Sequence, residues 1–336
     1  MEALIHNYYL TFPTFVLVLI IAGALYTVGK GADILVDEAV SLSVHWGIPK
    51  MVIGATIVSL GTTLPEAAVS VMAAVGGNPD LALGNAIGSI IADTGLIIGL
   101  AALIGHLPVD PMIIKRQGKL QYLACALLTV VSLPFLTAKP GGNISQLMGF
   151  FFLALLVAYI YISLKWAREE NGQHDDEIKE ELSPVYLQII KLLIGITLVI
   201  GSSKLLIPAV EITAIRIGIP QGVIAATLIA FGTSLPELVT AITAVRKGHG
   251  ELAVGNIVGA DILNVLFVVG ASAAVTTGGL HVPAGFYKLQ FPTMMIVIFA
   301  FRHFTKGKDL QITRNEGLFL GGIYAIYIIL NYTWLA

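Results

Sequence analysis

The sequence is short of charged residues and of cysteine. Only 12% of its 336 residues are charged, about half the share of a typical soluble domain, and the net charge is −2. This balance gives no argument for nucleic-acid binding. Cys125 is the single cysteine, so an intramolecular disulfide is excluded. The opening MEALIHNYYL lacks the basic region of a secretion signal, and we expect it to be retained.

Long apolar runs take the place of charge. The sequence is 56% hydrophobic, with a mean hydropathy of +0.87. Its apolar runs are roughly 18 to 30 residues long, and a helix needs about 20 to cross a bilayer. Strand-like alternation is absent, which argues against a β-barrel. The sequence therefore predicts an all-α integral membrane protein.

One pair of motifs occurs twice, 171 residues apart. GIPKMVIGATIVSLGTTLPE (47–66) recurs as GIPQGVIAATLIAFGTSLPE (218–237), and LALGNAIGSIIADTGLIIG (81–99) recurs as LAVGNIVGADILNVLFVVG (252–270). Across 47–99 and 218–270 there are 21 identities in 53 aligned positions. We therefore expect a first repeat at 1–165, a solvated acidic linker at 166–183 and a second repeat at 184–336.

Five apolar spans are expected in each half. They cover 13–44, 48–75, 80–105, 119–137 and 145–165, then 184–216, 220–245, 250–275, 286–303 and 314–334. An odd number of spans turns the second half over in the membrane, an arrangement common in secondary transporters. With the N-terminus outside, the inner loops hold 12 Lys and Arg and the outer loops three. The positive-inside rule thus favours a multi-pass cell-membrane protein of ten helices with both termini outside.

The GTTLPE and GTSLPE copies place polar residues halfway through two spans. Proline has no amide hydrogen, so Pro65 and Pro236 should kink each helix. Three side chains on each copy share one helix face with a glutamate: Ser59, Thr62, Thr63 and Glu66, matched by Ala230, Thr233, Ser234 and Glu237. A kink with hydroxyls bonded to their own backbone would explain one copy, but two buried glutamates favour a functional site.

The following spans add a second polar set. Ser89 and Asp93 lie one turn apart, and their repeat mates are Ala260 and Asn264. Asp261 aligns with Ile90 and points away from this face, toward another helix or an aqueous path. Glycines in GNAIG and GNIVG favour close helix packing. The charged residues of the long first spans, such as Asp33 and Asp37, are expected to pair with one another or lie near the interface.

The chemistry of the midplane set indicates a hard cation. Glu66, Glu237 and Asp93 have no balancing lysine or arginine at the midplane, so they must take up protons or bind a metal ion. Carboxylates, hydroxyls and carbonyls without histidine or cysteine suit Ca²⁺, Na⁺ or K⁺ and disfavour zinc.

At these residues the sequence resembles the cation/calcium antiporter superfamily, and within it the prokaryotic sodium/calcium exchangers with their potassium-dependent relatives. GTTLPE with GNAIGS, and GTSLPE with GNIVGA, look like the two alpha-repeats of that family. The resemblance implies the sodium/calcium exchanger fold, two inverted five-helix repeats, and no enzymatic activity or cofactor. It implies Ca²⁺ and Na⁺ as transported substrates in a lipid bilayer, with no obligate protein partner.

The resemblance also implies ligands, which we carry over by position. They are Glu66, Glu237, Asp93, Asn264, Thr62, Thr63, Thr233, Ser234, Ser89, Ser59 and Ala230. The two glutamates and the Thr62 and Thr233 carbonyls would hold Ca²⁺ at the centre. The hydroxyls and the remaining carbonyls would form flanking Na⁺ sites. The family pattern has an asparagine at the position of Asp93 and an aspartate at that of Asn264, so the acid and the amide are exchanged here. Ala260 stands where the pattern has a serine.

Four other functions compete with sodium-driven calcium exchange. Proton/calcium exchange would use the same carboxylates, but the GNxxE context typical of those exchangers is absent. Potassium-dependent exchange stays open. An intramembrane protease is disfavoured because GAD at 259–261 has no YD partner, and a channel is disfavoured by inverted repeats with carboxylates on both broken helices.

Overall fold

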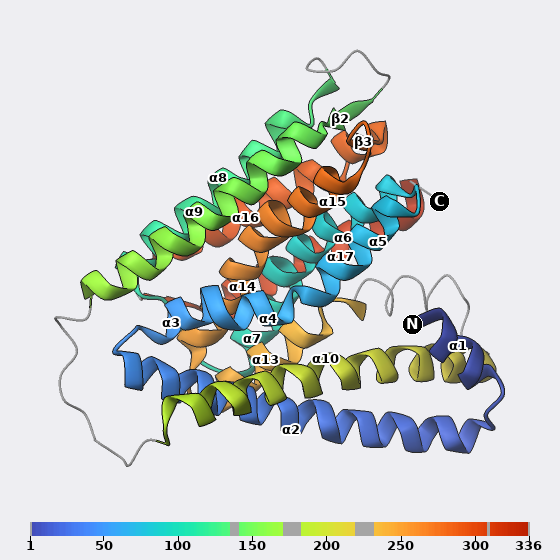
Figure 1. Ribbon diagram of the computed structural model, residues 1–336, viewed down its shortest axis with the longest axis horizontal. Coiled ribbons are helices and arrows are strands. Elements are labelled where there is room, and N and C mark those ends of the chain that lie inside the picture. The colour runs from blue at the N-terminus through green and yellow to red at the C-terminus, as the bar shows by residue number, and fades with distance from the viewer. Residues whose placement is uncertain (1, 135–140, 171–182, 219–231, 308–309, 335–336) are drawn as a thin grey trace.

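The computed structural model describes residues 2–134, 141–170, 183–218, 232–307 and 310–334, which are almost entirely helical (Figure 1). The helices of the first half are α1 (Glu2–Leu10), α2 (Thr14–Trp46), α3 (Lys50–Ile53), α4 (Ser59–Thr62), α5 (Leu64–Val75), α6 (Pro79–Ile91), α7 (Ile98–Ile104), α8 (Pro111–Val131) and α9 (Gln146–Glu170). Those of the second half are α10 (Val185–Arg216), α13 (Leu235–Arg246), α14 (Gly250–Leu263), α15 (Gly270–Val275), α16 (Gln290–Phe304) and α17 (Arg314–Trp334).

Three longer helical runs contain a π-helical turn: η1 (Gly54–Val58), η2 (Ala92–Ile97) and η5 (Asn264–Val269). A 3₁₀ turn, η6 (Ala284–Tyr287), precedes α16. A π-helical turn is wider than an α-helical one and leaves some carbonyls without their usual partner. In η1 the Ala55 carbonyl accepts a hydrogen bond from the Tyr159 hydroxyl of α9, at 2.8 Å.

Two small antiparallel ribbons join the halves, although the sequence predicts no strand. β1 (Leu107–Pro108) pairs with β4 (Gln311–Ile312), and β2 (Gly142–Ile144) pairs with β3 (Leu280–Val282). Each ribbon takes one strand from each half of the chain. Segments this short and partly polar carry too little alternation to be recognised in the sequence.

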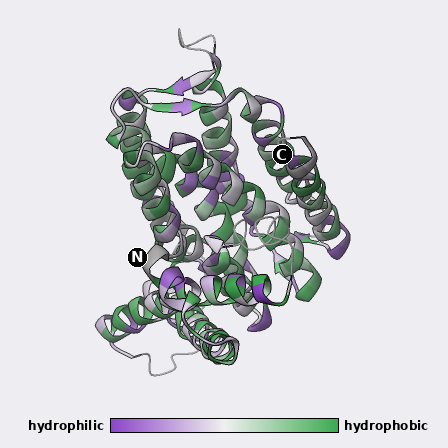
Figure 2. Cartoon of the chain, turned by 90° about the vertical axis from the view of Figure 1, so that its right-hand side faces the viewer, coloured by the Kyte–Doolittle hydropathy of each residue, from purple (hydrophilic) through white to green (hydrophobic). Residues whose placement is uncertain are grey.

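The helices have the surface of a membrane protein. Hydrophobic colour prevails along them in Figure 2. Within the described residues, six helices are long and apolar enough to cross a membrane, or seven if Lys50–Thr62 and Leu64–Val75 form one bent span. The all-α membrane fold is thus confirmed, whereas ten spans stay a prediction. Most of the first half of the seventh expected span, residues 219–231, lies outside the described residues.

Two expected span starts are wrong, and the span expected to end at 137 is a helix that ends at Val131. The helix expected at 119–137 is α8, which begins at Pro111 because Asp110 caps it, accepting a hydrogen bond from the Ile113 amide at 2.9 Å. Its polar first turns, with Lys115 and Arg116, hid this start from a hydropathy argument. The helix expected from 286 begins at Gln290, since the preceding residues form η6.

The centre of the molecule is built by backbone-to-backbone packing of α14 against α3, η1 and α4. A Cβ added at Gly255 would overlap the Met51 carbonyl, and one added at Gly259 would overlap the Ala55 carbonyl. On the facing segment η1, a Cβ added at Gly54 would lie 2.5 Å from the Leu252 carbonyl oxygen of α14. Glycine therefore has the packing role that the sequence indicates for the second copy, and it brings two polar helices into direct contact.

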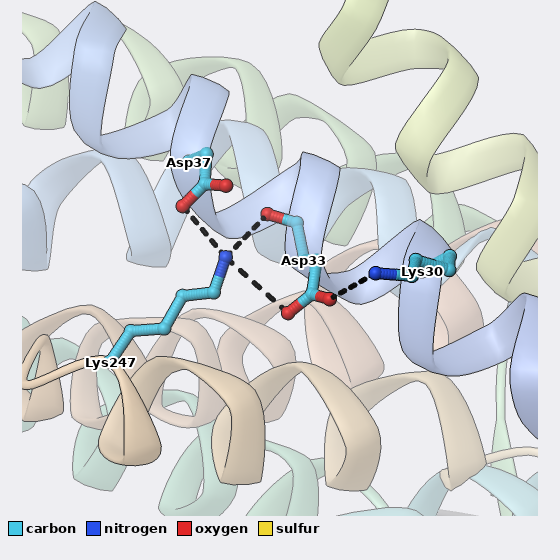
Figure 3. Close-up of polar contacts among 4 residues, drawn as sticks. All are labelled: Lys30, Asp33, Asp37 and Lys247. Carbon is cyan, nitrogen blue, oxygen red and sulfur yellow. Dashed lines mark hydrogen bonds and ion pairs between the residues drawn. The ribbon is translucent and has the colours of Figure 1, made fainter.

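Helices α2 and α10 pack against each other along one side of the molecule (Figure 1). Ion pairs tie α2 to the end of α13 (Figure 3): Lys247 lies 2.8 Å from Asp37 Oδ1 and 3.3 Å from Asp33 Oδ1. Lys247 also donates to the Asp33 carbonyl at 3.2 Å. Burial alone would lower the pKa of Lys247, but the hydrogen bonds and charges of Asp37 and Asp33 raise it. We call these three residues the Lys247 clamp.

Close packing at the centre predicts an intolerance of side chains. Gly255→Ala should lower the free energy of unfolding by about 1–3 kcal/mol, because the added methyl meets backbone that cannot rotate away. The apparent melting temperature in detergent measures this. Gly23→Ala on α2 is the matched control, since its Cβ would meet nothing within 4 Å. Equal melting temperatures for both variants would contradict the packing described here.

Candidate cation-binding site

The GTTLPE segment breaks its helix. α4 ends at Thr62, α5 begins at Leu64, and the two are bent by 44°. Pro65 sits in the first turn of α5, where its missing amide costs no hydrogen bond. The second copy behaves alike, since α13 begins at Leu235 with Pro236 in its first turn. The expected kink is therefore confirmed for the first copy, and both prolines open a new helix.

This geometry puts both glutamates at helix N-termini. Glu66 lies in the first turn of α5 and Glu237 in the first turn of α13, where the helix dipole favours a negative charge. Each is only 1% exposed. Within the described part of the chain, neither oxygen of either carboxylate has a hydrogen-bond partner. Oxygens left so bare in a protein interior are costly, and a bound cation would satisfy them.

The third carboxylate and its repeat mate come from π-helical turns. Asp93 lies in η2, and Asn264 is the first residue of η5. Both side chains are 1% exposed, and Asp93 Oδ1 and Asn264 Oδ1 have no hydrogen-bond partner among the residues described. The charge of Asp93 acts on Glu66, and that of Glu237 acts on both. The three acids are thus near enough to act electrostatically on one another, although no three acidic, histidine or cysteine side chains among the described residues form a group that could hold a metal ion.

Reciprocal hydrogen bonds join the two halves at this point. Thr62 donates to Asn256 Oδ1 at 3.4 Å, and Thr233 donates to Asn85 Oδ1 at 3.1 Å. Both pairs are related by the 171-residue offset. Thr233 also lies within electrostatic reach of Glu66, and Thr62 of Glu237. Each threonine therefore lies near both the asparagine and the glutamate of the opposite half.

Asn85 and Asn256 are absent from the ligands expected from sequence. Asn85 donates to Ser70 Oγ at 3.0 Å and to the Glu66 carbonyl at 3.4 Å, so it holds the first turn of α5. Their signals in the sequence are the GN dipeptide that both copies of the motif share and a position one helical turn before Ser89 and Ala260. Which threonine they meet depends on how the halves pack, and spacing along one helix cannot reveal it.

The remaining expected ligands divide into three groups. Thr63, Ser234 and Ser89 are buried, and the Thr63 and Ser234 hydroxyls have no partner within the described segments. The Ser59 carbonyl, by contrast, already accepts hydrogen bonds from the Thr63 amide at 2.9 Å and the Thr62 hydroxyl at 3.4 Å. Ala230 lies outside the described residues.

The site as a whole is rich in oxygen and has no internal counter-charge. Among the described residues, no lysine, arginine or histidine forms an ion pair with Glu66, Glu237 or Asp93. Buried carboxylates with hydroxyl and amide neighbours match the ligand preferences of hard cations. These oxygens come from the break between α4 and α5, the start of α13 and two π-helical turns.

Known proteins with the same plan were identified by comparison. A family described as "Sodium/calcium exchanger protein" matches residues 16–165 and 187–333. The inner membrane protein YrbG of Escherichia coli is 35% identical over 95% of this chain and 97% of its own length. The sodium/calcium exchanger MaX1 of Methanosarcina acetivorans is 28% identical over 89% of this chain and 94% of its own.

Solved structures agree with these sequence matches. A structure of the sodium–calcium exchanger NCX_Mj, soaked with Na⁺ and Sr²⁺, superposes with a TM-score of 0.79. The alignment covers 94% of this chain and 99% of that one, at 27% sequence identity.

The reciprocal hydrogen bonds predict that Asn85 supports the site without touching a cation. Asn85→Leu leaves the Thr233 hydroxyl and the first turn of α5 without their partner, so Ca²⁺ affinity should fall by about 10-fold. Calorimetric titration of purified protein with Ca²⁺ measures the change. Asn143→Leu is the control, because Asn143 bonds the Gly278 carbonyl on an exposed ribbon. An Asn85 variant with the affinity of the Asn143 variant contradicts this role.

Proposed function

The chain belongs to the sodium/calcium exchanger family, and on this premise we propose that it exchanges Na⁺ for Ca²⁺ across a cell membrane by alternating access. Family membership makes it a multi-pass membrane protein of a transporter family. The choice of Na⁺ as the coupling ion, the direction of the termini and the ion ligands are parts of the proposal. It is a transporter and not an enzyme, with ions as cargo.

One observation carries the proposal. Glu66 and Glu237 stand at corresponding positions of two repeats, both buried at the start of a helix, and neither carboxylate has a protein partner among the described residues. A structural carboxylate at such depth would be paired with a base or hydrogen-bonded. Two partnerless ones, with Asp93 beside them, supply the negative charge that a divalent cation requires.

The membrane arrangement we propose follows the duplication. Residues 1–165 and 184–336 form two five-helix repeats of opposite orientation, joined by the linker at 166–183 on the inner side, with both termini outside. The Thr62–Asn256 and Thr233–Asn85 hydrogen bonds support a two-fold relation between the halves. The excess of Lys and Arg in the inner loops supports the direction.

Within the site we assign Ca²⁺ to the centre and Na⁺ to the flanks. Glu66, Glu237, Asp93 and Asn264 are the central ligands, because their unpartnered oxygens come from four separate helix starts or turns. The buried and unpartnered hydroxyls of Thr63 and Ser234 suit a single positive charge better than a double one. Since the carboxylates are shared, Na⁺ and Ca²⁺ would compete for one site, which is the requirement for exchange.

The moving parts we propose are α2 and α10. They pack mainly on each other at one side of the molecule, while the site is held by α4, α5, α13 and α14 (Figure 1). Sliding of this pair over a fixed site would expose the site alternately to the two sides. The Lys247 clamp joins α2 to the site-bearing helix α13 at the end assigned to the inner side (Figure 3).

Coupling to H⁺ or K⁺ is the second candidate. Buried carboxylates without counter-charges can carry protons as readily as metal ions. The exchange of acid and amide between Asp93 and Asn264, and Ala260 opposite Ser89, depart from the sodium pattern. These departures bear on which ion drives the exchange and leave the Ca²⁺ site itself intact.

The proposed coupling predicts which gradient drives transport. Proteoliposomes loaded with Na⁺ should accumulate ⁴⁵Ca²⁺ in Na⁺-free buffer, and a pH or K⁺ gradient alone should not do so. Glu66→Gln and Glu237→Gln should each abolish uptake, because each removes one charge from a shared ligand set.

Glu251→Gln is the control for these variants. Glu251 is also an acid in the first turn of a helix, but it pairs with Lys50 near the surface. Near-normal uptake by either site variant would refute the ligand assignment. Uptake that a pH gradient drives and that does not depend on Na⁺ would show that the transporter is coupled to protons and not to sodium.

The Lys247 clamp predicts a shift between the two access states. Lys247→Met removes the only described ion pairs between α13 and α2, so the inward-open state should gain population by about 2- to 10-fold. The ratio of half-saturating Ca²⁺ at the outer and inner faces, in vesicles of both orientations, measures this. Lys30→Met is the control, because Lys30 pairs with Asp33 on its own helix. An unchanged ratio excludes a gating role for the clamp.

A further inference from the structure

A fourth carboxylate lies buried beside the candidate site. Asp261 of α14 is 0% exposed, and its Oδ2 accepts hydrogen bonds from Thr94 Oγ1 at 2.5 Å and from Gln121 Nε2 at 2.6 Å. These three residues come from α14, η2 and α8, so the carboxylate is fixed between three elements. None of them is among the ligands assigned above.

Two oxygens of this cluster are left without donors. Asp261 Oδ1 and Gln121 Oε1 have no hydrogen-bond partner among the described residues, and both side chains are completely buried. Gln121 Oε1 belongs to the same planar amide whose Nε2 contacts Asp261, so it lies beside the carboxylate. Leaving both oxygens unsatisfied in the interior is costly, and one bound positive charge would satisfy both.

The charge of the interior points the same way. Glu66, Glu237, Asp93 and Asp261 carry four negative charges when ionised, and no described lysine, arginine or histidine forms an ion pair with them. A Ca²⁺ ion at the centre compensates only two. The charge of Asp261 acts on Asp93, and Thr94, which donates to Asp261, follows Asp93 directly in the chain. Asp261 is therefore linked to the central site both by its charge and through Thr94.

We propose that Asp261 and Gln121, held in place by Thr94, form a second site that binds one monovalent cation while Ca²⁺ occupies the central site. The cation is H⁺, Na⁺ or K⁺, each of which supplies one positive charge to Asp261 Oδ1 and Gln121 Oε1. The link to Ca²⁺ rests on the proposed function, whereas the site itself does not. Its occupancy would set how many monovalent charges accompany each Ca²⁺ ion.

The first test uses stability, because it needs neither Ca²⁺ nor transport. The apparent melting temperature of purified protein is measured in Ca²⁺-free buffer while H⁺, Na⁺ and K⁺ are varied one at a time. A cation that binds the folded protein stabilises it by mass action. Asp261→Asn, which keeps an acceptor for Thr94 and Gln121, should respond more weakly than wild type to one of the three cations, because its central site still binds cations but its second site does not. Identical responses of wild type and variant to all three overturn the proposal.

Matched glutamine variants separate cation binding from packing. Gln121→Met should lose the same cation response as Asp261→Asn. Gln117→Met should keep it, because Gln117 lies one turn away on α8, is equally buried, and donates to Ser163 Oγ at 3.1 Å instead. If Gln117→Met loses the response too, the effect belongs to α8 packing and the site is refuted.

Calorimetric titration with Ca²⁺ then tests the link to the central site. In wild type the apparent Ca²⁺ affinity should change by up to about tenfold for each tenfold change in the concentration of the monovalent cation that the second site binds. In Asp261→Asn the Ca²⁺ affinity should depend less on the concentration of that cation, by up to about tenfold for each tenfold change. A wild type that shows the stability response but no Ca²⁺ binding refutes the proposed function and leaves the monovalent site standing.

Discussion

A carboxylate at the centre of an apolar bundle must find a positive charge, and the rest of this structure follows from that need. Glu66, Glu237 and Asp93 are buried without a described basic partner. Prolines in the first turns of α5 and α13 leave the glutamates at helix N-termini, and two π-helical turns carry Asp93 and Asn264. Glycines 255 and 259 let the helices approach closely enough for these groups to meet. The irregular features of the fold are thus gathered where the charge lies.

The sequence predicted what repetition and hydropathy can encode. The membrane class, the helix break at GTTLPE and the burial of Glu66, Glu237 and Asp93 were all accessible, because each depends on local pattern or on the 171-residue duplication. The start of α8 was not, since an Asp110 cap before a polar turn leaves no hydropathy signal. Neither were the Thr–Asn pairs between the halves, nor the contacts of Asp261 with Thr94 and Gln121. Those depend on packing between helices far apart in the chain.

The two polar centres differ in how they are held. At the central site most acceptor oxygens are free and the supporting hydrogen bonds come from neighbours such as Asn85. At Asp261 one oxygen is bound tightly by two donors and the other is free. The first arrangement suits ions that must enter and leave, because little of the protein has to be displaced. The second suits a charge held at a fixed place, from which it influences its neighbour.

The Thr62–Asn256 and Thr233–Asn85 hydrogen bonds also bear on how the molecule is made. A ribosome finishes the first half of the chain before residues 233–256 exist, so Glu66 and Asp93 enter the membrane with their opposite partners still missing. The two ribbons also form only after the second half is made, because β1 pairs with β4 and β2 pairs with β3. Assembly of the candidate site therefore has to wait for the second half of the chain. The same contacts between the halves hold the candidate site and complete the fold.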